Sequence, residues 1–208
     1  MKAINWAITQ GCNIITMSFG MEQSAQYHEG FQKFDKAIGN AHDAGILMFA
    51  AASNCGANGS RTYPAWDCRV VGVHALDGCG WPSRSLNPST NGFPSDNFGT
   101  LGVAIKCSWQ GKIVYKSGTS FATPIAAGIA ALVLEYMDQS YALNRVDEAS
   151  YKTFRQCDGM RQIFLKFMSK EMGNCGYRFV APWIIWNPRL YTDEDIWSSL
   201  KVSYLPNG

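Results

Sequence analysis

The segment SGTSFATPIAAGIAALVLEY at residues 117–136 constrains the fold more than any other part of this sequence. Its apolar residues are mostly small, so it predicts a helix over about 119–137 that lies deep against a sheet. Gly118 and Thr119 form the turn before this helix. Pro124 is expected in the first helical turn, where its missing N–H is tolerated. Ser120 would then lie at the positive end of a buried helix dipole, which favours negative charge on a nearby oxygen, although a serine there is also an ordinary helix cap.

Residues 1–116 predict short strands that alternate with helices. Predicted helices cover 3–9 and 31–45, each with a glycine stop at Gly11 or Gly45. Predicted strands cover 13–19, 46–52, 69–76 and 112–115, and the Gly-, Pro-, Ser- and Asn-rich segment 78–100 predicts a loop. The strands are continuously apolar, which is typical of parallel sheets covered on both faces. The expected fold class is therefore α/β, with a parallel, doubly wound sheet.

The sequence changes in character after residue 137. Apolar residues at helical spacing predict one amphipathic helix, formed around Met160, Phe164, Phe167 and Met168. An aromatic coil is expected beyond it, through Trp183, Trp186 and Trp197. We therefore expect two parts, residues 1–137 and a helical and aromatic extension at 138–208 that packs on them.

The composition excludes several classes of function but does not assign one. Hydrophobic residues make up 47% and charged residues 16% of the chain, which indicates a compact globular protein. A net charge of +2 predicts no nucleic-acid or membrane partner, and no stretch reaches the length expected of a membrane span. The first residues do not resemble a signal peptide, which favours an intracellular location. The seven cysteines form no C-x-x-C pair, so we expect free thiols, and no cofactor is predicted.

Two other segments accompany the serine. FAAASNCGANG, at 49–59, ends a predicted strand with Asn54, which is either a turn residue or an amide able to donate to an oxyanion. ITMSFG, at 15–20, ends its strand with backbone groups free to pair with an extended peptide.

In this order, these segments resemble the subtilisin-like serine proteases. NWAITQGCNIITMSFG is similar to the family's helix and strand that lead to its substrate-binding segment S-x-G. AAASNCG is similar to the family's oxyanion loop A-A-G-N-x-G, and SGTSFATPIAAGIAAL to its nucleophile motif G-T-S-x-A-x-P. TYPAWDCRVVGVHAL and DNFGTLG also resemble family segments, and the middle and tail resemble intracellular subtilases of filamentous fungi. The similarity covers about residues 3–137.

The resemblance implies a serine endopeptidase that acts on polypeptides through an acyl-enzyme. It implies that Ser120 is the nucleophile and that Asn54 and the N–H of Ser120 bind the oxyanion. Its remaining implied residues are Ser18, Phe19 and Gly20 at one edge of the peptide cleft, and Ala51, Ala52 and Ser53 in the pocket for the residue before the scissile bond. Calcium is bound by some members, but this sequence assigns it no ligands.

The sequence departs from the family in one important respect. The family's D-[ST]-G and H-G-T-H motifs, which supply the orienting carboxylate and the base, are not found, and His28, His42 and His74 lie in other contexts. We therefore expect the carboxyl-terminal part of a catalytic domain that lacks its first strands and is inactive alone. Ser53 also stands where the family usually has glycine, and VAIKC replaces its A-P-G.

Other functions remain as alternatives. An inactive subtilase remnant could serve as a peptide- or protein-interaction module. A lipase-like hydrolase needs G-x-S-x-G and a nucleotide-binding sheet needs G-x-G-x-x-G, and neither motif is found here.

Overall fold

The computed structural model describes residues 1–22, 29–90, 96–173, 175–187, 189, 192, 194–196 and 198. His28 and Trp197, which the sequence singled out, lie outside the described residues. The elements are α1 (Lys2–Thr9), β1 (Ile14–Met17), α2 (Glu29–Asp43), β2 (Leu47–Ala51), β3 (Val71–Leu76), β4 (Phe98–Leu101), β5 (Ile105–Trp109), β6 (Lys112–Lys116), α3 (Thr119–Ala142), α4 (Glu148–Phe154), α5 (Cys157–Ile163), a π-helical turn (Phe164–Met168), β7 (Ser169–Glu171), β8 (Arg178–Val180) and a 3₁₀ turn (Pro182–Ile184).

The main sheet has six strands in the order β1-β2-β3-β4-β8-β7. Every neighbouring pair from β1 to β8 is parallel, and only β7 runs antiparallel, beside β8. All residues of β2 and β3 are buried, as their continuous apolar sequences predict. The predicted α/β fold with a mostly parallel sheet is confirmed.

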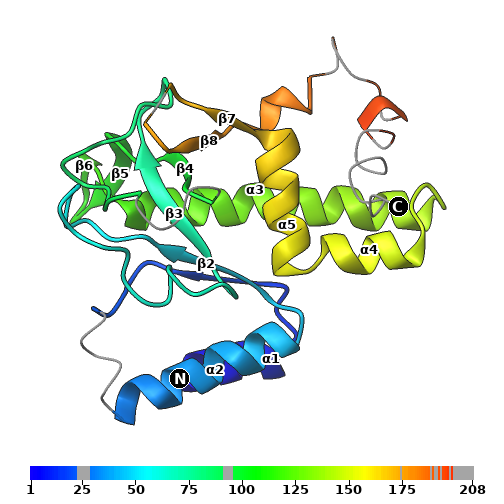
Figure 1. Ribbon diagram of the computed structural model, residues 1–208, viewed down its shortest axis with the longest axis horizontal. Helices are drawn as coiled ribbons and strands as arrows, with labels where there is room; N and C mark the ends of the chain where they lie inside the picture. Colours follow the sequence, from blue (N-terminus) through cyan, green and yellow to red (C-terminus); the bar gives the residue numbers. More distant parts are fainter. Residues whose placement is uncertain are drawn as a thin grey trace.

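Helices cover both faces of this sheet (Figure 1). Alternate residues of β2 belong to two separate cores, because successive side chains of a strand point to opposite faces. Leu47 and Phe49 pack with α3 and α5, whereas Met48 and Ala50 pack with α1 and α2. The ribbon shows α1 and α2 together on one side of the strands and α3 running across the other. The sheet is therefore the middle layer of three.

Helix α3 contacts β1, β2, β3 and β4, and its small residues Ala122, Ala126 and Ala130 are buried. It is 24 residues long and has a mean hydropathy of 1.5 over its most apolar window, so the expectation that no stretch reaches the length of a membrane span is wrong by length and composition. Half of that window is buried in the fold, as in the core helix of a globular domain.

One expectation about the strands is wrong. Segment 78–100 was expected to be loop, but β4 begins at Phe98 and is buried through Thr100. Its glycine is required by close packing, because a Cβ at Gly99 would lie 2.7 Å from Cγ of Leu76. The strand expected at 112–115 is confirmed as β6, and among the described residues it pairs only with β5, in a two-stranded sheet separate from the main one.

The carboxyl-terminal residues take part in the same core. Residue 137, where we expected a boundary, lies inside α3, and β8 extends the main sheet beside β4. The helix predicted around Met160 is confirmed as α5 and the π-helical turn after it, with Met160, Phe164 and Met168 buried.

Candidate active site

Ser120 is the second residue of α3 and is half-buried. Its hydroxyl donates a hydrogen bond to the carbonyl of Ser18, at 3.3 Å, just beyond the end of β1. The turn before the helix is fixed because the Gly118 N–H donates to the Gly102 carbonyl at 2.8 Å. The carboxyl end of β1 and the amino end of α3 therefore meet at this serine.

Pro124 explains a second bond between the same two residues. Helix α3 begins at Thr119, so Pro124 lies in the second turn and not in the first, as we had expected. Proline has no N–H, which leaves the carbonyl of Ser120, four residues earlier, without its helical donor. The hydroxyl of Ser18 donates to that carbonyl at 2.9 Å. The helical hydrogen bond that Pro124 cannot donate is thus replaced by a hydrogen bond from Ser18.

Asn54 follows β2 and lies against the start of α3. Its Oδ1 accepts the Thr119 N–H at 2.9 Å and lies 3.1 Å from the Thr119 hydroxyl. A backbone N–H can only donate, so this bond fixes the amide with Oδ1 toward the helix and Nδ2 as a donor on the other side. A Cβ at Gly118 would lie 3.2 Å from Nδ2, so a larger residue there would crowd the amide.

Two N–H groups therefore remain available as donors at this place. The structure gives no acceptor to Asn54 Nδ2 among the described residues. The N–H of Ser120 belongs to the first helical turn, where α-helical geometry offers no partner. Donors held in this way at a helix amino terminus can stabilise an oxygen that acquires negative charge.

Ser53 has the backbone of a glycine. Its φ of 142° lies in a region that residues with a Cβ rarely adopt, at the position where the family usually has glycine. Its hydroxyl contacts the thiol of the exposed Cys55 and accepts the Cys55 N–H at 3.3 Å. The Ser53 carbonyl lies 3.3 Å from the Thr119 hydroxyl. These contacts hold Ser53 in a strained conformation beside Asn54.

The other predicted site residues are placed as follows. Ser18, Phe19 and Gly20 are exposed, and Gly20 lies so close to Thr62 that a Cβ would be 2.0 Å from the Thr62 hydroxyl oxygen. Ala51 and Ala52 are 5% and 0% exposed, so of the three expected pocket residues only Ser53 has an accessible side chain. The roles of all six residues in substrate binding stay predictions.

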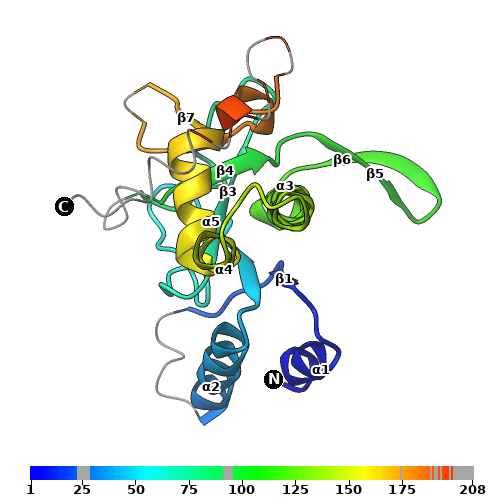
Figure 2. The same cartoon turned by 90° about the vertical axis from the view of Figure 1, so that its right-hand side faces the viewer.

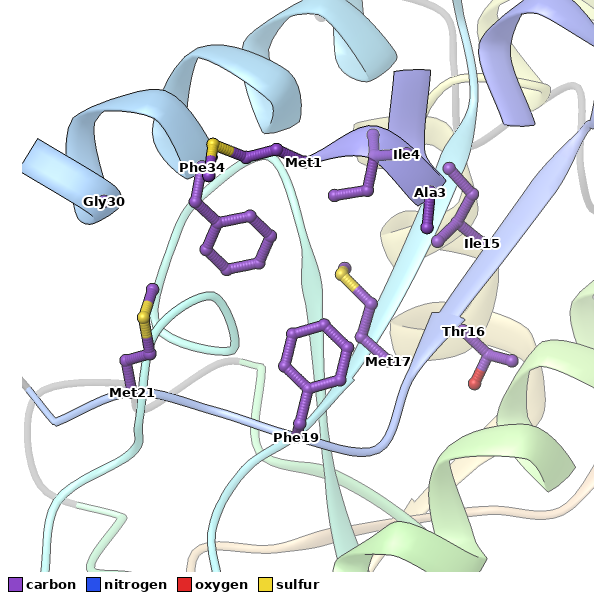
Figure 3. Close-up of a pocket in the computed structure, with 10 residues that line it drawn as sticks. All are labelled: Met1, Ala3, Ile4, Ile15, Thr16, Met17, Phe19, Met21, Gly30 and Phe34. Carbon is purple, nitrogen blue, oxygen red and sulfur yellow. The ribbon is translucent and has the colours of Figure 1, made fainter. Parts of the chain in front are cut away.

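Phe19 also borders a cavity of about 370 Å³ between α1, β1 and α2. Figure 3 shows its ring and that of Phe34 facing this space, with the side chains of Met17 and Met21 beside them. The ring centroids of Phe19 and Phe34 are 5.9 Å apart. The lining has no ionisable side chain and does not include Ser120, so this cavity has no chemical groups for hydrolysis.

The two histidines in the described part of the chain have other environments. His42 is exposed at the end of α2, with Nδ1 3.4 Å from Asp43. His74 is fully buried in β3, where its ring lies 5.0 Å from that of Tyr177. Burial, and then the positive charge of Arg61, hold the pKa of His74 well below its usual value. Neither shares a hydrogen bond with Ser120 among the described contacts.

A partly buried charged cluster lies beside β3, where a Cβ at Gly72 would be 3.2 Å from Arg61 Nη1. Asp96 binds Arg61 at 3.1 Å and Arg161 at 2.9 Å, and Arg61 also donates to the Asp96 carbonyl. These bonds join the loop before β4 to α5. No group of three or more acidic, cysteine or histidine side chains suited to a metal occurs within the described ranges.

The structure thus brings Ser120, Asn54 and Ser18 together where the ends of β1 and β2 meet the amino end of α3. Residues 1–162 match the Subtilase family, and the chain belongs to that family. Membership implies a serine peptidase, and hence a polypeptide substrate.

Individual relatives agree with this assignment. The chain is 32% identical to the subtilisin-like protease het-Q2 of Podospora anserina, over 83% of this chain and 49% of that protein. It is 35% identical to the thermostable alkaline protease of Halalkalibacterium halodurans, over 73% of this chain and 39% of that protein. The chain thus spans about half the length of these relatives or less, and the finer resemblance to fungal intracellular members stays a prediction.

Solved structures show the same fold. The patellamide maturation protease PatA superposes with a TM-score of 0.69 at 22% identity, over 97% of this chain and 67% of that chain. The prenylagaramide maturation protease PagA has a TM-score of 0.58 at 32% identity, over 66% of this chain and 49% of that chain.

Sequence analysis missed the part played by Thr119. This residue is 0% exposed, and both its N–H and its hydroxyl contact Asn54, although the sequence indicated only a turn residue. The available signal was the threonine between Gly118 and Ser120. If its hydroxyl is buried, it needs a hydrogen-bond partner, which Asn54 provides.

Proposed function

We propose that this chain carries the nucleophile and the oxyanion donors of a serine endopeptidase. Ser120 attacks the substrate carbonyl, and Asn54 Nδ2 together with the Ser120 N–H binds the developing oxyanion. The observation that carries this proposal is the orientation of Asn54, whose Oδ1 accepts the Thr119 N–H at 2.9 Å and leaves Nδ2 as a donor. Asn54 is itself exposed, yet its side chain bonds to the first turn of α3, which the role of a turn residue does not require.

The chemistry follows from the groups present. As the Ser120 Oγ–C bond forms, the hydroxyl proton passes to a base and the carbonyl oxygen becomes negative. The C–N bond then breaks, the base returns its proton to the leaving amine, and water hydrolyses the acyl-enzyme by the same sequence in reverse. In this chain, Ser120 Oγ is the nucleophile of acylation and the leaving group of hydrolysis, and the two donors bind the oxyanion in both.

No base accepts a hydrogen bond from the Ser120 hydroxyl among the described residues. The Ser120 hydroxyl donates to the Ser18 carbonyl, which is too weak a base to accept the proton fully. Catalysis therefore requires an imidazole that replaces Ser18 as the acceptor, held by a carboxylate. We propose that a segment bearing D-[ST]-G and H-G-T-H supplies both groups.

The substrate is proposed to be an extended polypeptide that lies along residues 18–20. Ser53 stands at the wall of the pocket for the residue before the scissile bond, with Ala51 and Ala52 behind it. Residues 1–137 are proposed to form the catalytic part and residues 138–208 an extension packed on it. The packing of this extension is supported by the core that Phe154, Met160 and Phe164 share with β2 and β3.

A second candidate is an inactive member that binds peptides without cleaving them. The observation that favours it is the pair of bonds between Ser18 and Ser120, which satisfies the serine without a base.

Covalent labelling distinguishes the two candidates. Two samples would be treated with a fluorophosphonate. The first is the 208-residue chain by itself, and the second is the chain co-expressed with a subtilase segment that carries D-[ST]-G and H-G-T-H. We expect labelling at Ser120, mapped by mass spectrometry, only in the second sample, and its loss in Ser120→Ala. No labelling in a complex that has formed would support the inactive binding module instead.

A further inference from the structure

The hairpin of β5 and β6 stands apart from the rest of the molecule. Figure 2 shows it projecting beyond α3, away from the main sheet. Each strand pairs only with the other, so both outer edges have free backbone groups within the described structure. An extended chain can add to such an edge through main-chain hydrogen bonds.

Its surface is both apolar and basic. The side chains of Trp109, Ile113 and Tyr115 are 59%, 68% and 66% exposed, a density of exposed apolar groups that marks interaction sites. Lysines at 106, 112 and 116 lie on the same two strands and are exposed. Between Asp96 and Glu135 the sequence contains these lysines and no acidic residue.

These lysines have no acidic partner inside the fold. No ion pair to them occurs in the part of the chain that the structure describes, and Lys116 Nζ lies 5.3 Å from the centre of the Trp109 ring. The hairpin thus presents uncompensated positive charge beside aromatic surface, although the whole chain has a net charge of only +2.

The hairpin is joined directly to the candidate active site. At its base, the Ala104 N–H donates to the Ser117 hydroxyl at 2.9 Å, and the Gly118 N–H donates to the Gly102 carbonyl at 2.8 Å. Ser120 follows Lys116 by four residues. A polypeptide bound along the hairpin would therefore pass close to the serine.

We propose that the β5–β6 hairpin is an exosite for an acidic, extended segment of the polypeptide substrate. The lysines pair with carboxylates, the exposed rings cover apolar side chains, and a free strand edge can hold the backbone. The inference rests on the proposed function, because the position beside Ser120 is what favours a polypeptide over other polyanions. It adds a preference for acidic residues at a distance from the scissile bond.

Binding can be measured without cleavage. A fluorescent Glu-rich peptide and its Gln-for-Glu counterpart would be titrated against the chain carrying Ser120→Ala, at low and at high salt. We expect the acidic peptide to bind more tightly, and this difference to shrink in high salt. Because an exposed ion pair contributes about twofold, Lys106→Gln, Lys112→Gln and Lys116→Gln together should weaken the binding of the acidic peptide about tenfold.

The matched control removes the same charge elsewhere. Lys2, Lys36 and Lys170 are exposed on other elements, and their combined change to Gln should leave the affinity within twofold. Charge reversal with Lys106→Glu, Lys112→Glu and Lys116→Glu should make the chain prefer a Lys-rich peptide, and an unchanged thermal unfolding transition would show that the variant is still folded.

Three results would overturn the exosite. They are equal affinity for the acidic and neutral peptides, equal weakening by the control set, and tighter binding of an oligonucleotide or an anionic vesicle than of the acidic peptide. Since binding is measured with Ser120→Ala, failure of the exosite is distinct from failure of fluorophosphonate labelling at Ser120, which tests the proposed function.

Discussion

Ser18 and Ser120 exchange two hydrogen bonds although 102 positions separate them in the sequence. The Ser18 hydroxyl donates to the Ser120 carbonyl, and the Ser120 hydroxyl donates to the Ser18 carbonyl. The first bond fills the gap left by Pro124, and the second holds the candidate nucleophile. The segment that contains Ser18 and the candidate nucleophile Ser120 are therefore positioned by the same pair of hydrogen bonds. A displacement of either segment changes both bonds.

A double-mutant cycle tests the role of Pro124. Ser18→Ala removes the donor to the Ser120 carbonyl and should lower the free energy of unfolding by about 0.5–1 kcal/mol. Pro124 is exposed, so Pro124→Ala leaves no cavity and adds an N–H that can bond the same carbonyl. In the Pro124→Ala background, Ser18→Ala should lower the free energy of unfolding by less than half of what it does in the wild-type chain, as measured by urea unfolding. Equal costs in both backgrounds would show that the two donors do not serve one acceptor.

The oxyanion assignment predicts a kinetic pattern in the complex that contains the base. Asn54→Ala should lower kcat about 10²–10³-fold with little change in KM, a magnitude known for one such donor in subtilisin. Thr119→Val removes a hydroxyl that contacts Asn54 and should lower kcat by a smaller factor, while Thr119→Ser should restore it. A rise in KM at constant kcat in Asn54→Ala would instead assign Asn54 to substrate binding.

The backbone at Ser53 predicts an inverted order of stability. At ordinary positions, alanine is more stable than glycine by about 0.5–1 kcal/mol. At a φ of 142°, glycine alone avoids strain, so Ser53→Gly should be more stable than Ser53→Ala by about 1 kcal/mol. Thermal unfolding of the two variants makes the comparison, and a more stable alanine variant would contradict the strain at this residue.

Buried His74 predicts a dependence of stability on pH. Burial and Arg61 hold its folded pKa below the unfolded value near 6.5, so the unfolded chain binds the proton more readily. The free energy of unfolding should therefore decrease as the pH falls below about 6.5, by up to about 1.4 kcal/mol per pH unit. Neither ring nitrogen has a hydrogen-bond partner among the described residues, so charging finds no compensation there.

Variants isolate this effect. His74→Phe keeps a ring beside Tyr177 and should flatten the stability profile between pH 7 and 5, measured by urea unfolding. His42→Gln, at an exposed position, should retain the wild-type slope. A slope unchanged in His74→Phe would assign the acid sensitivity to other groups.

The sequence predicted the central fold because its signals were local. Continuous apolar runs located β1, β2 and β3, and small residues located α3. β4 was missed because its glycine is needed for contact with Leu76, a residue more than twenty positions earlier, and glycine alone indicates a loop. The pairing of β6 with β5 was missed because register depends on a partner strand that local patterns do not identify.

The site was predictable in its parts but not in its connections. The resemblance to subtilase motifs brought Ser120, Asn54 and Ser18 into one hypothesis, and the structure brings these three segments together. The part of Thr119 in orienting Asn54 and the hydrogen bond that compensates for Pro124 depend on atoms from distant segments. Such bonds follow from tertiary packing and have no periodic signal in the sequence.

The order of elements along the chain has a consequence for biosynthesis. The strands β1 to β4, on which α3 packs, precede it in the sequence, whereas β8 and β7 follow it. As the chain emerges from the ribosome amino terminus first, those strands are exposed before the apolar helix is complete. Helix α3 has the length and hydropathy of a membrane segment, but the strands on which it packs are already present when it is synthesised. Early packing on these strands shortens the time for which the apolar helix is exposed to the membrane-insertion machinery.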